Sequence, residues 1–263
     1  MPRWLIAGVG VVYLFLHLPI IVLMVFSFND SRFSVDWRGF TLQWYQRLLE
    51  RPDITQGLKT SLLVGATATA ISVVLGTLIA LGLARHRFPG RRAVGGLVYI
   101  PLVTPEIVVG ISLLILFATL GWPLGITTIT IAHVAFCISF VVIVMLARLD
   151  GMDQSLEEAA MTLGADEITT FRRVTLPQLW PGMLAGALLA FTISFDDFVI
   201  TSFVAGPGSS TLPVVVYGMV RRTVEPSVNA ISTIILVVTA LLIYLADRLI
   251  RAGGRVAEHQ VSR

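Results

Sequence analysis

Six long apolar runs are the feature of this sequence that most restricts its fold. Each run has about 20 residues or more, the length that a helix needs to cross the hydrocarbon core of a bilayer. The runs cover residues 4–28, 60–84, 93–118, 126–147, 179–204 and 228–246. Only 13% of the residues are charged, whereas a soluble domain of this size would have about 25%. The sequence therefore predicts an all-α integral membrane protein with six transmembrane helices in a single domain, residues 1–263.

Arginine residues set the predicted orientation of these helices, because cytoplasmic loops of membrane proteins are enriched in Lys and Arg. With the N-terminus in the cytoplasm, most arginines fall on the cytoplasmic side. They are Arg3, Arg85, Arg87, Arg91, Arg92, Arg148, Arg172, Arg173, Arg248, Arg251, Arg255 and Arg263. Both termini and the segment 155–177 are therefore expected inside. The first run is too long for the apolar region of a signal peptide, so we interpret it as a retained membrane helix.

A polar, helix-forming segment, residues 155–177, separates the fourth and fifth runs. Ser155 followed by Glu158 is the pattern of a capping box, which starts a helix. One face of this helix is apolar and mostly small, with helical spacing. Its members are Leu156, Ala159, Ala160 and Leu163. Since a small-residue face lets another backbone approach closely, we interpret the segment as a docking element for a partner. An ordinary amphipathic loop is the alternative.

A glycine is expected to divide this segment into two helices. Gly164 can take the positive φ at which many helices end. Asp166 can then cap a second short helix. We expect that helix to end at Leu176-Pro177, because proline interrupts helical hydrogen bonds.

The same segment resembles the EAA loop of permease subunits of ABC importers. The matching order is Glu158-Ala159-Ala160, Gly164, Val174 and Leu176-Pro177, with Val174 where the family more often has Ile. The resemblance implies a MetI-like type I permease in which this loop, about residues 150–177, carries the coupling helix. It implies that Glu158, Ala159, Ala160, Gly164, Leu176 and Pro177 serve the contact with two cytoplasmic ATP-binding subunits.

The resemblance covers nearly the whole chain and is closest to the permeases of spermidine/putrescine importers. The similar stretches include residues 26–29, 44–45, 105–106, 111–114, 191–198, 202–207 and 226–230. It implies a heterodimer with a second homologous permease, a periplasmic or extracellular solute-binding protein, and a polyamine cargo that crosses the bacterial inner membrane. No cofactor, metal or nucleic acid is expected, and lipid surrounds the helices.

Three charged residues fall well inside the runs: Glu106, Asp196 and Asp197. A charge at the bilayer centre costs about 2.5–3.5 kcal/mol. No Lys or Arg lies inside the same runs, so these carboxylates are protonated, face water or meet a cation. We interpret them as a cation pathway, with interhelical hydrogen bonding as the alternative. Adjacent helix positions point in different directions, so one aspartate would line the path while the other caps a broken helix or bonds across an interface.

Other polar and aromatic residues have structural interpretations. His133 is expected to bond between helices, and Cys137 to be a small buried residue. Trp37, Trp44 and Tyr45 in the first external loop are interpreted as anchors in the headgroup layer, with docking of an external partner as the alternative.

Two sequence patterns concern helix packing and breaks. Pro101 and Pro105 are expected to interrupt the third run. Gly182, Gly186 and Ala190 form a small-residue series that packs within this subunit or against a second one.

Motifs of several other protein classes are missing from the sequence. Lys59 is the only lysine and lies outside any phosphate-binding loop motif, so ATP must be hydrolysed by another subunit. No recognisable catalytic constellation supports an intramembrane enzyme. Two alternatives remain: an importer for another organic solute such as a phosphonate or an opine, and an ATP-independent secondary transporter or channel. An anionic cargo would call for arginine inside the runs, which weighs against the first.

Overall fold

The computed structural model describes residues 2–31, 36–222 and 226–241, and helices make up most of this part of the chain. The helices are α1 (Arg3–Phe26), α2 (Gln43–Leu49), α3 (Pro52–Arg85), α4 (Arg91–Val103), α5 (Glu106–Thr119), α6 (Ile126–Asp150), α7 (Ser155–Thr162), α8 (Glu167–Thr170), η1 (Phe171–Thr175), α9 (Leu176–Asp196), α10 (Val199–Val204), α11 (Leu212–Arg222) and a last helix, Pro226–Leu241.

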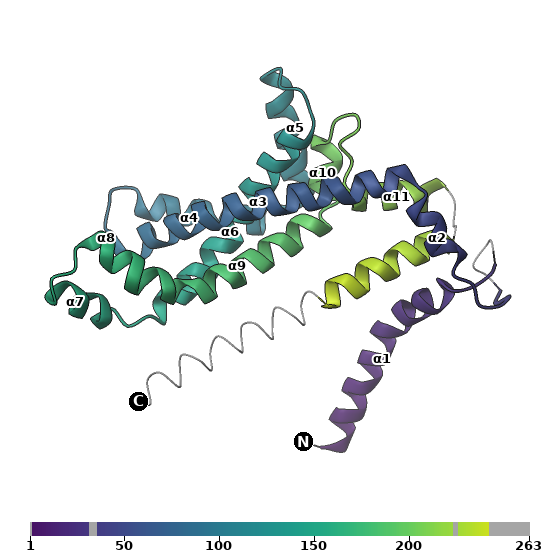
Figure 1. Cartoon of the computed structure of the whole chain (residues 1–263), viewed down its shortest axis with the longest axis horizontal. Helices are drawn as coiled ribbons and strands as arrows, with labels where there is room; N and C mark the ends of the chain where they lie inside the picture. Colours follow the sequence, from purple (N-terminus) through teal and green to yellow (C-terminus); the bar gives the residue numbers. More distant parts are fainter. Residues whose placement is uncertain (1, 32–35, 223–225, 242–263) are drawn as a thin grey trace.

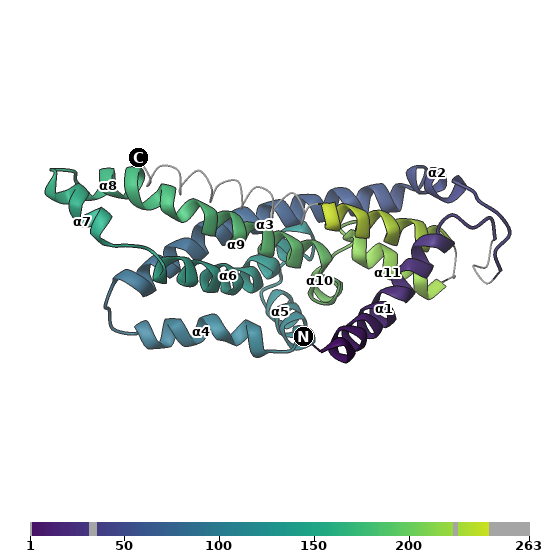
Figure 2. The same cartoon turned by 90° about the horizontal axis from the view of Figure 1, so that it is seen from below.

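The bundle is elongated and is built around α3, which packs against α6, α9 and α11 (Figure 1). Both views place α7 and α8 at one end of the bundle and α2 and α11 toward the other (Figure 2). We call these the α7 end and the α2 end. The main core lies between α3, α6 and α9, where small residues allow the backbones to approach. A Cβ atom on Gly76 of α3, for example, would lie 2.7 Å from Val141 of α6.

Two of the predicted spans are broken. α4 and α5 are bent by 110° relative to each other, at the predicted Pro105, which cannot donate a backbone hydrogen bond. The prediction is wrong for Pro101, which lies inside α4 without ending it. The fifth run is divided at Asp197 and Phe198 into α9 and α10. Within the described residues, four helices are long and apolar enough to cross a membrane, or up to five if the bent pair is one span. The sixth run, 228–246, extends beyond the described residues.

The segment after α6 follows the sequence prediction in part. Gly164 has φ +92° and separates α7 from α8, and the carboxylate of Asp166 accepts a hydrogen bond from Thr169 N–H at 3.2 Å. The predicted capping box is wrong, because α7 has no side-chain cap and it is the Asp153 carboxylate that accepts from Ser155 N–H at 2.9 Å.

The predicted helix end at Leu176-Pro177 is also wrong. The chain passes from α8 through one π-helical turn, η1, directly into α9. Proline is disfavoured inside an α-helix because its ring meets the carbonyl four residues earlier. A π turn is wider and is often found where an α-helix takes up an extra residue. Pro177 therefore lies in the first turn of α9 and does not end the helix.

The small-residue series on α9 packs within this subunit, against α6. A Cβ on Gly182 would lie 2.8 Å from Arg148 Cγ, and one on Gly186 would lie 3.4 Å from Val141. Cys137 is buried, as predicted, and its thiol donates to the Ala190 carbonyl at 3.6 Å. Of the two alternatives for this series, packing inside the subunit is confirmed.

Two tryptophans of the first predicted external loop, Trp37 and Trp44, differ in burial. Trp44 is 5% exposed, and its ring N–H donates to the Asn29 carbonyl at 2.8 Å. The interpretation of Trp44 as an anchor in the headgroup layer is therefore wrong, because α2 folds back onto α3 and α11. Trp37 is half-exposed, so its interpretation stays a prediction. α1 projects away from the bundle, and within the described residues none of its 18-residue apolar window is buried (Figure 1).

Candidate functional site

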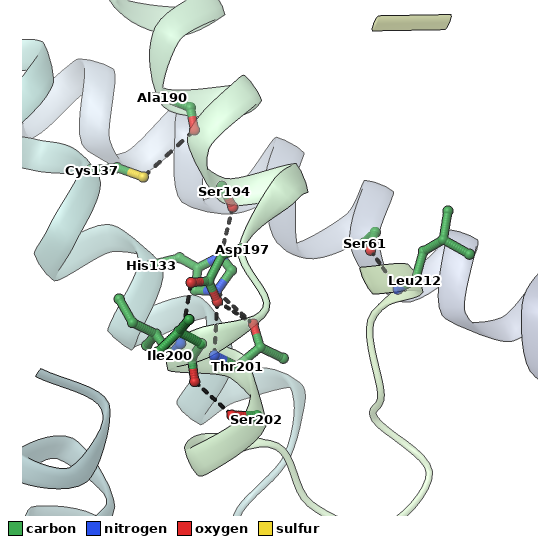
Figure 3. Close-up of polar contacts among 11 residues, drawn as sticks. Ser61, His133, Cys137, Ala190, Ser194, Asp197, Ile200, Thr201, Ser202 and Leu212 are labelled. Carbon is green, nitrogen blue, oxygen red and sulfur yellow. Dashed lines mark hydrogen bonds and ion pairs between the residues drawn. The ribbon is translucent and has the colours of Figure 1, made fainter. Parts of the chain in front are cut away.

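The break between α9 and α10 is held by the carboxylate of Asp197. Its Oδ1 accepts from Ile200 N–H at 3.2 Å, and its Oδ2 accepts from the backbone N–H and the hydroxyl of Thr201 at 2.8 and 2.7 Å. These backbone donors belong to the first turn of α10, whose N–H groups have no partner inside the helix. Figure 3 shows the carboxylate at the centre of this network. Asp197 therefore caps the second half of the broken helix.

A histidine from α6 completes the network around Asp197. His133 Nε2 lies 3.2 Å from Asp197 Oδ2, and the two side chains are 1% and 8% exposed. The other ring nitrogen, Nδ1, lies 2.7 Å from Ser194 Oγ on α9. The prediction that His133 bonds between helices is confirmed. The sequence argument missed the pairing with Asp197 because it counted only Lys and Arg as partners for buried carboxylates.

Asp196, the preceding residue, points to a different environment. It is exposed and, within the described residues, has no hydrogen-bond or ion-pair partner. It lines a pocket of about 440 Å³ between the end of α9, Phe198 in the break, α11 and the last helix. The pocket residues are Phe195, Asp196, Phe198, Leu212, Pro213, Val216, Tyr217, Val220, Ser232, Ile235 and Leu236. The expected division between the two aspartates is present: one caps and pairs, and the other is free.

Aromatic rings stand beside the free carboxylate. The rings of Phe198 and Tyr217 have centroids 4.2 Å apart, and the Arg221 guanidinium lies 5.3 Å from the centroid of the Tyr217 ring. An aromatic face attracts cations through its quadrupole. Asp196 is the one charged residue among the pocket residues. The pocket therefore combines one negative charge with aromatic and aliphatic walls, which suits a cation that has apolar segments.

Glu106 is not brought into this pocket. It is the exposed first residue of α5, where a carboxylate is favoured by the positive end of the helix dipole. One turn later, Gly110 packs against Phe203 of α10 so closely that a Cβ would lie 2.6 Å from its ring. Glu106 thus lies on the helix that packs against α10, while Asp196 and Asp197 flank the start of α10.

The residues predicted to contact an ATP-binding subunit differ in how exposed they are to solvent. Glu158, Ala159 and Gly164 are exposed at the α7 end, whereas Ala160 is half-buried. Leu176 and Pro177 lie at the start of α9, after α8 and η1; Leu176 is half-buried and Pro177 is exposed. Four apolar side chains are also exposed on the tip. Two belong to the predicted apolar face, Leu156 (51%) and Leu163 (88%), and two were not singled out by the prediction, Met161 (45%) and Ile168 (68%).

Two aspartates stabilise the turns of this tip. The backbone hydrogen bond from Ser155 lowers the pKa of Asp153, and the hydrogen bonds from Thr169 lower the pKa of Asp166. Both carboxylates therefore stay ionised to a lower pH than a free aspartate, each at the start of a short helix, where negative charge is favoured. In the described part of the chain, no group of His, Cys, Asp and Glu side chains could hold a metal ion.

Comparison with known proteins gives consistent matches over most of the chain. The family described as "Binding-protein-dependent transport system inner membrane component" matches residues 72–255. The spermidine/putrescine transport system permease protein PotC of Escherichia coli (strain K12) is 41% identical over 239 residues, 91% of this chain and 90% of that protein. The putrescine transport system permease protein PotI of the same organism is 40% identical over 250 residues, 92% of this chain and 89% of that protein.

Solved structures show the same fold at low sequence identity. One is a crystal structure of a bacterial ABC transporter involved in the import of the acidic polysaccharide alginate. It has a TM-score of 0.73 and 17% identity, over 92% of this chain and 93% of that chain. Another is an inward-facing structure of the MetNI methionine ABC transporter, with a TM-score of 0.62 and 17% identity, over 81% of this chain and 99% of that chain. The predicted MetI-like permease fold is confirmed.

Proposed function

This chain belongs to the family of binding-protein-dependent transport system inner membrane components, and we propose from this premise that it is the permease subunit of an ABC importer for polyamines. The observation that carries the cargo is the pocket at Asp196. There, an unpaired carboxylate stands beside aromatic rings in a chain that is 41% identical to a spermidine/putrescine permease. ATP is hydrolysed by a separate subunit, so this chain is not itself the enzyme.

The chemistry of the pocket favours a polyamine over the alternative cargoes. A polyamine is a chain of methylene groups with ammonium groups along it. Asp196 supplies the opposite charge for an ammonium group, and the aromatic and aliphatic walls, which include Phe198 and Tyr217, supply apolar contact for the methylene groups. A phosphonate or another anion would meet a carboxylate here instead of a positive charge. Asp197 is already paired with His133 and serves the pathway by holding the break in place.

Partners complete the transporter in this proposal. The exposed tip residues Glu158, Ala159 and Gly164, with Leu163 and Ile168 beside them, dock on one of two cytoplasmic ATP-binding subunits. The unburied apolar surface of α1 packs against a second homologous permease and against lipid. A solute-binding protein delivers the cargo at the α2 end. One related alginate transporter has been crystallised with its periplasmic protein bound.

The membrane topology belongs to the same proposal. The chain forms one transmembrane domain of six spans, with α4 and α5 forming one broken span and the last span starting at Pro226. The α7 end and both termini lie in the cytoplasm, and α2 lies outside. The distribution of arginine supports this orientation.

Alternating access is the proposed mechanism. Closure of the two ATP-binding subunits moves α7, and this movement rocks the helices between inward-open and outward-open arrangements. Asp196, and Glu106 at the bend between α4 and α5, meet the cation as it passes. Because α5 packs on α10 at Gly110, movement of either broken span is transmitted to the other.

Uptake of labelled spermidine tests this function. Cells that contain the other importer subunits and no redundant importer would be compared with and without this gene. We expect uptake to disappear in the deletion and to fall about tenfold in Asp196→Asn at normal protein abundance. Asp150→Asn is the matched control, since Asp150 is an exposed carboxylate at the α7 end of α6. Unaltered uptake in the deletion would refute the polyamine cargo.

Vesicles test the alternative of an ATP-independent transporter. Vesicles that contain both permeases but lack the ATP-binding subunits should take up no spermidine under a proton gradient. Uptake in these vesicles would contradict the importer assignment.

A further inference from the structure

We propose that Glu157, the residue before the predicted docking glutamate, is a positioning residue that joins α7 to the walls of the solute pocket. This inference rests on the proposed function, because it concerns how movement of α7 reaches the transported solute. The observation behind it is a branched contact at the α7 end of the bundle, which we call the Glu157 latch. It consists of Glu157, Arg85 and Thr175.

The contacts of the latch are short and partly shielded from water. Arg85 Nη1 lies 2.7 Å from Glu157 Oε2, and Arg85 Nη2 lies 2.9 Å from Glu157 Oε1. The two side chains are 19% and 15% exposed. The Thr175 hydroxyl donates to Glu157 Oε1 at 2.9 Å, and Thr175 is itself buried. A bidentate arginine–carboxylate pair fixes geometry as well as charge, so the latch holds α7 at one orientation.

α7 depends on this latch for its attachment. None of the α7 residues is buried within the described part of the chain. Among the described residues, Glu157 is the one α7 residue whose side chain hydrogen-bonds to α3 and η1. Its neighbour Glu158 is exposed and remains available for a partner. The two adjacent glutamates thus point in different directions: Glu157 toward the membrane helices and, in the proposed function, Glu158 toward the ATP-binding subunit.

The first branch of the latch leads through α3 to one wall of the pocket. Arg85 is the last residue of α3, which has 34 residues and is therefore about 50 Å long. Near the other end of α3, Ser61 Oγ accepts from Leu212 N–H at 2.9 Å. A Cβ on Gly57 would lie 3.1 Å from Val215, so α3 and α11 are in direct contact there. α11 carries Leu212 and Tyr217 of the pocket.

The second branch leads through η1 and α9 to the opposite wall. Thr175 is the last residue of η1 and directly precedes α9. α9 ends with Phe195 and Asp196, both of which line the pocket. A π turn at the base of α9 is a place where helical register can change. A displacement of Glu157 therefore reaches both pocket walls through two helices that are packed against each other.

Coupling between ATP hydrolysis and uptake is the measurement that tests the latch. In the reconstituted complex of both permeases, ATP-binding subunits and binding protein, we expect Glu157→Gln and Arg85→Gln each to lower spermidine uptake per ATP hydrolysed by about tenfold. The double variant should be no worse than either single variant, because both remove the same ion pair. The exchanged pair, Glu157→Arg with Arg85→Glu, should restore part of the uptake. The ATP-binding subunits should still co-purify. Glu167→Gln, an exposed carboxylate on α8, is the matched control.

A second measurement does not depend on the cargo. A cysteine in place of the pocket residue Leu236, which is 37% exposed, would be labelled with a soluble maleimide. The native Cys137 is buried and contributes little background. In the complex with otherwise native residues, the labelling rate should differ between the nucleotide-free and vanadate-trapped states, and Glu157→Gln should remove most of this difference.

The outcomes separate this inference from the proposed function. A full labelling response in both Glu157→Gln and Arg85→Gln would overturn the latch whatever the cargo is. Loss of the ATP-binding subunits from both variants would also overturn it, because Glu157 would then be part of the docking surface. A native complex that shows the labelling response but takes up no spermidine would refute the polyamine cargo and leave the latch supported or overturned by labelling alone.

Discussion

At the scale of single residues, Asp196 and Asp197 show how burial assigns different roles to identical side chains. Asp197 is 8% exposed and accepts hydrogen bonds from α10 beside the ring of His133. Asp196 is exposed and lines the pocket. A buried carboxylate needs such partners because the low dielectric penalises an unpaired charge. In the proposed function, the free carboxylate of Asp196 is the group that meets the solute.

Stability should therefore separate the two aspartates. Asp197→Ala removes the cap of α10 and leaves His133 without its partner, which we expect to destabilise the protein by about 3 kcal/mol. Asp196→Ala should change stability by less than about 0.5 kcal/mol, as is usual for exposed positions. Thermal unfolding of the purified complex in detergent measures both. Equal losses in the two variants would contradict the division of roles.

At the scale of elements, the turn between α7 and α8 requires glycine because of its backbone conformation, and not because neighbouring atoms leave no room for a side chain. Gly164 has φ +92°, and a Cβ placed on it would meet no atom within 4 Å. An added side chain therefore has room, but the backbone conformation itself is disfavoured for residues other than glycine. Asn tolerates the left-handed region much better than a β-branched residue does.

Two substitutions of Gly164 test whether the tip depends on this left-handed backbone conformation. We expect Gly164→Val to destabilise the turn by about 1–2 kcal/mol, to misplace the exposed tip and to reduce co-purification of the ATP-binding subunits. Gly164→Asn, with a side chain of similar size, should retain more of that co-purification. If Val and Asn behave alike in a pull-down at matched abundance, the tip does not depend on this conformation.

At the scale of the whole molecule, exposed apolar surface indicates a subunit and not a complete transporter. α1 leaves its apolar window unburied within the described residues, and α4 lies beside the bundle with much of its surface exposed. Lipid can cover part of this surface, and the proposed second permease would cover another part. In the proposed assembly, the second permease would also complete the wall of the pocket at Asp196.

Labelling from each side of the membrane tests the proposed topology. A cysteine at Trp37, in the loop before α2, should react with an impermeant maleimide added outside. A cysteine at Arg87, between α3 and α4, should react only after the cytoplasmic face is opened. Unsubstituted protein is the control, since its one cysteine is buried. Labelling of Arg87→Cys in intact spheroplasts would contradict the proposed orientation and favour the opposite one.

The sequence by itself determined the membrane class, most of the helix positions, the glycine break at Gly164 and the free carboxylate candidates. These features depend on local patterns: the length of an apolar run, the backbone freedom of glycine and the cost of charge in lipid. Two local predictions from the sequence were wrong. The capping box at Ser155 is absent because the Asp153 carboxylate accepts the hydrogen bond from Ser155 N–H. The helix does not end at Leu176-Pro177 because a π turn leads directly into α9.

Only the tertiary structure decided which charges are paired. His133 and Asp197 are 64 positions apart in the chain, and Arg85 and Glu157 are 72 positions apart. No periodic pattern records such pairs, because they depend on the packing of α6 against α9 and on the position of α7 beside the last residue of α3. The break at Asp197, the pocket beside Asp196 and the Glu157 latch all follow from that packing.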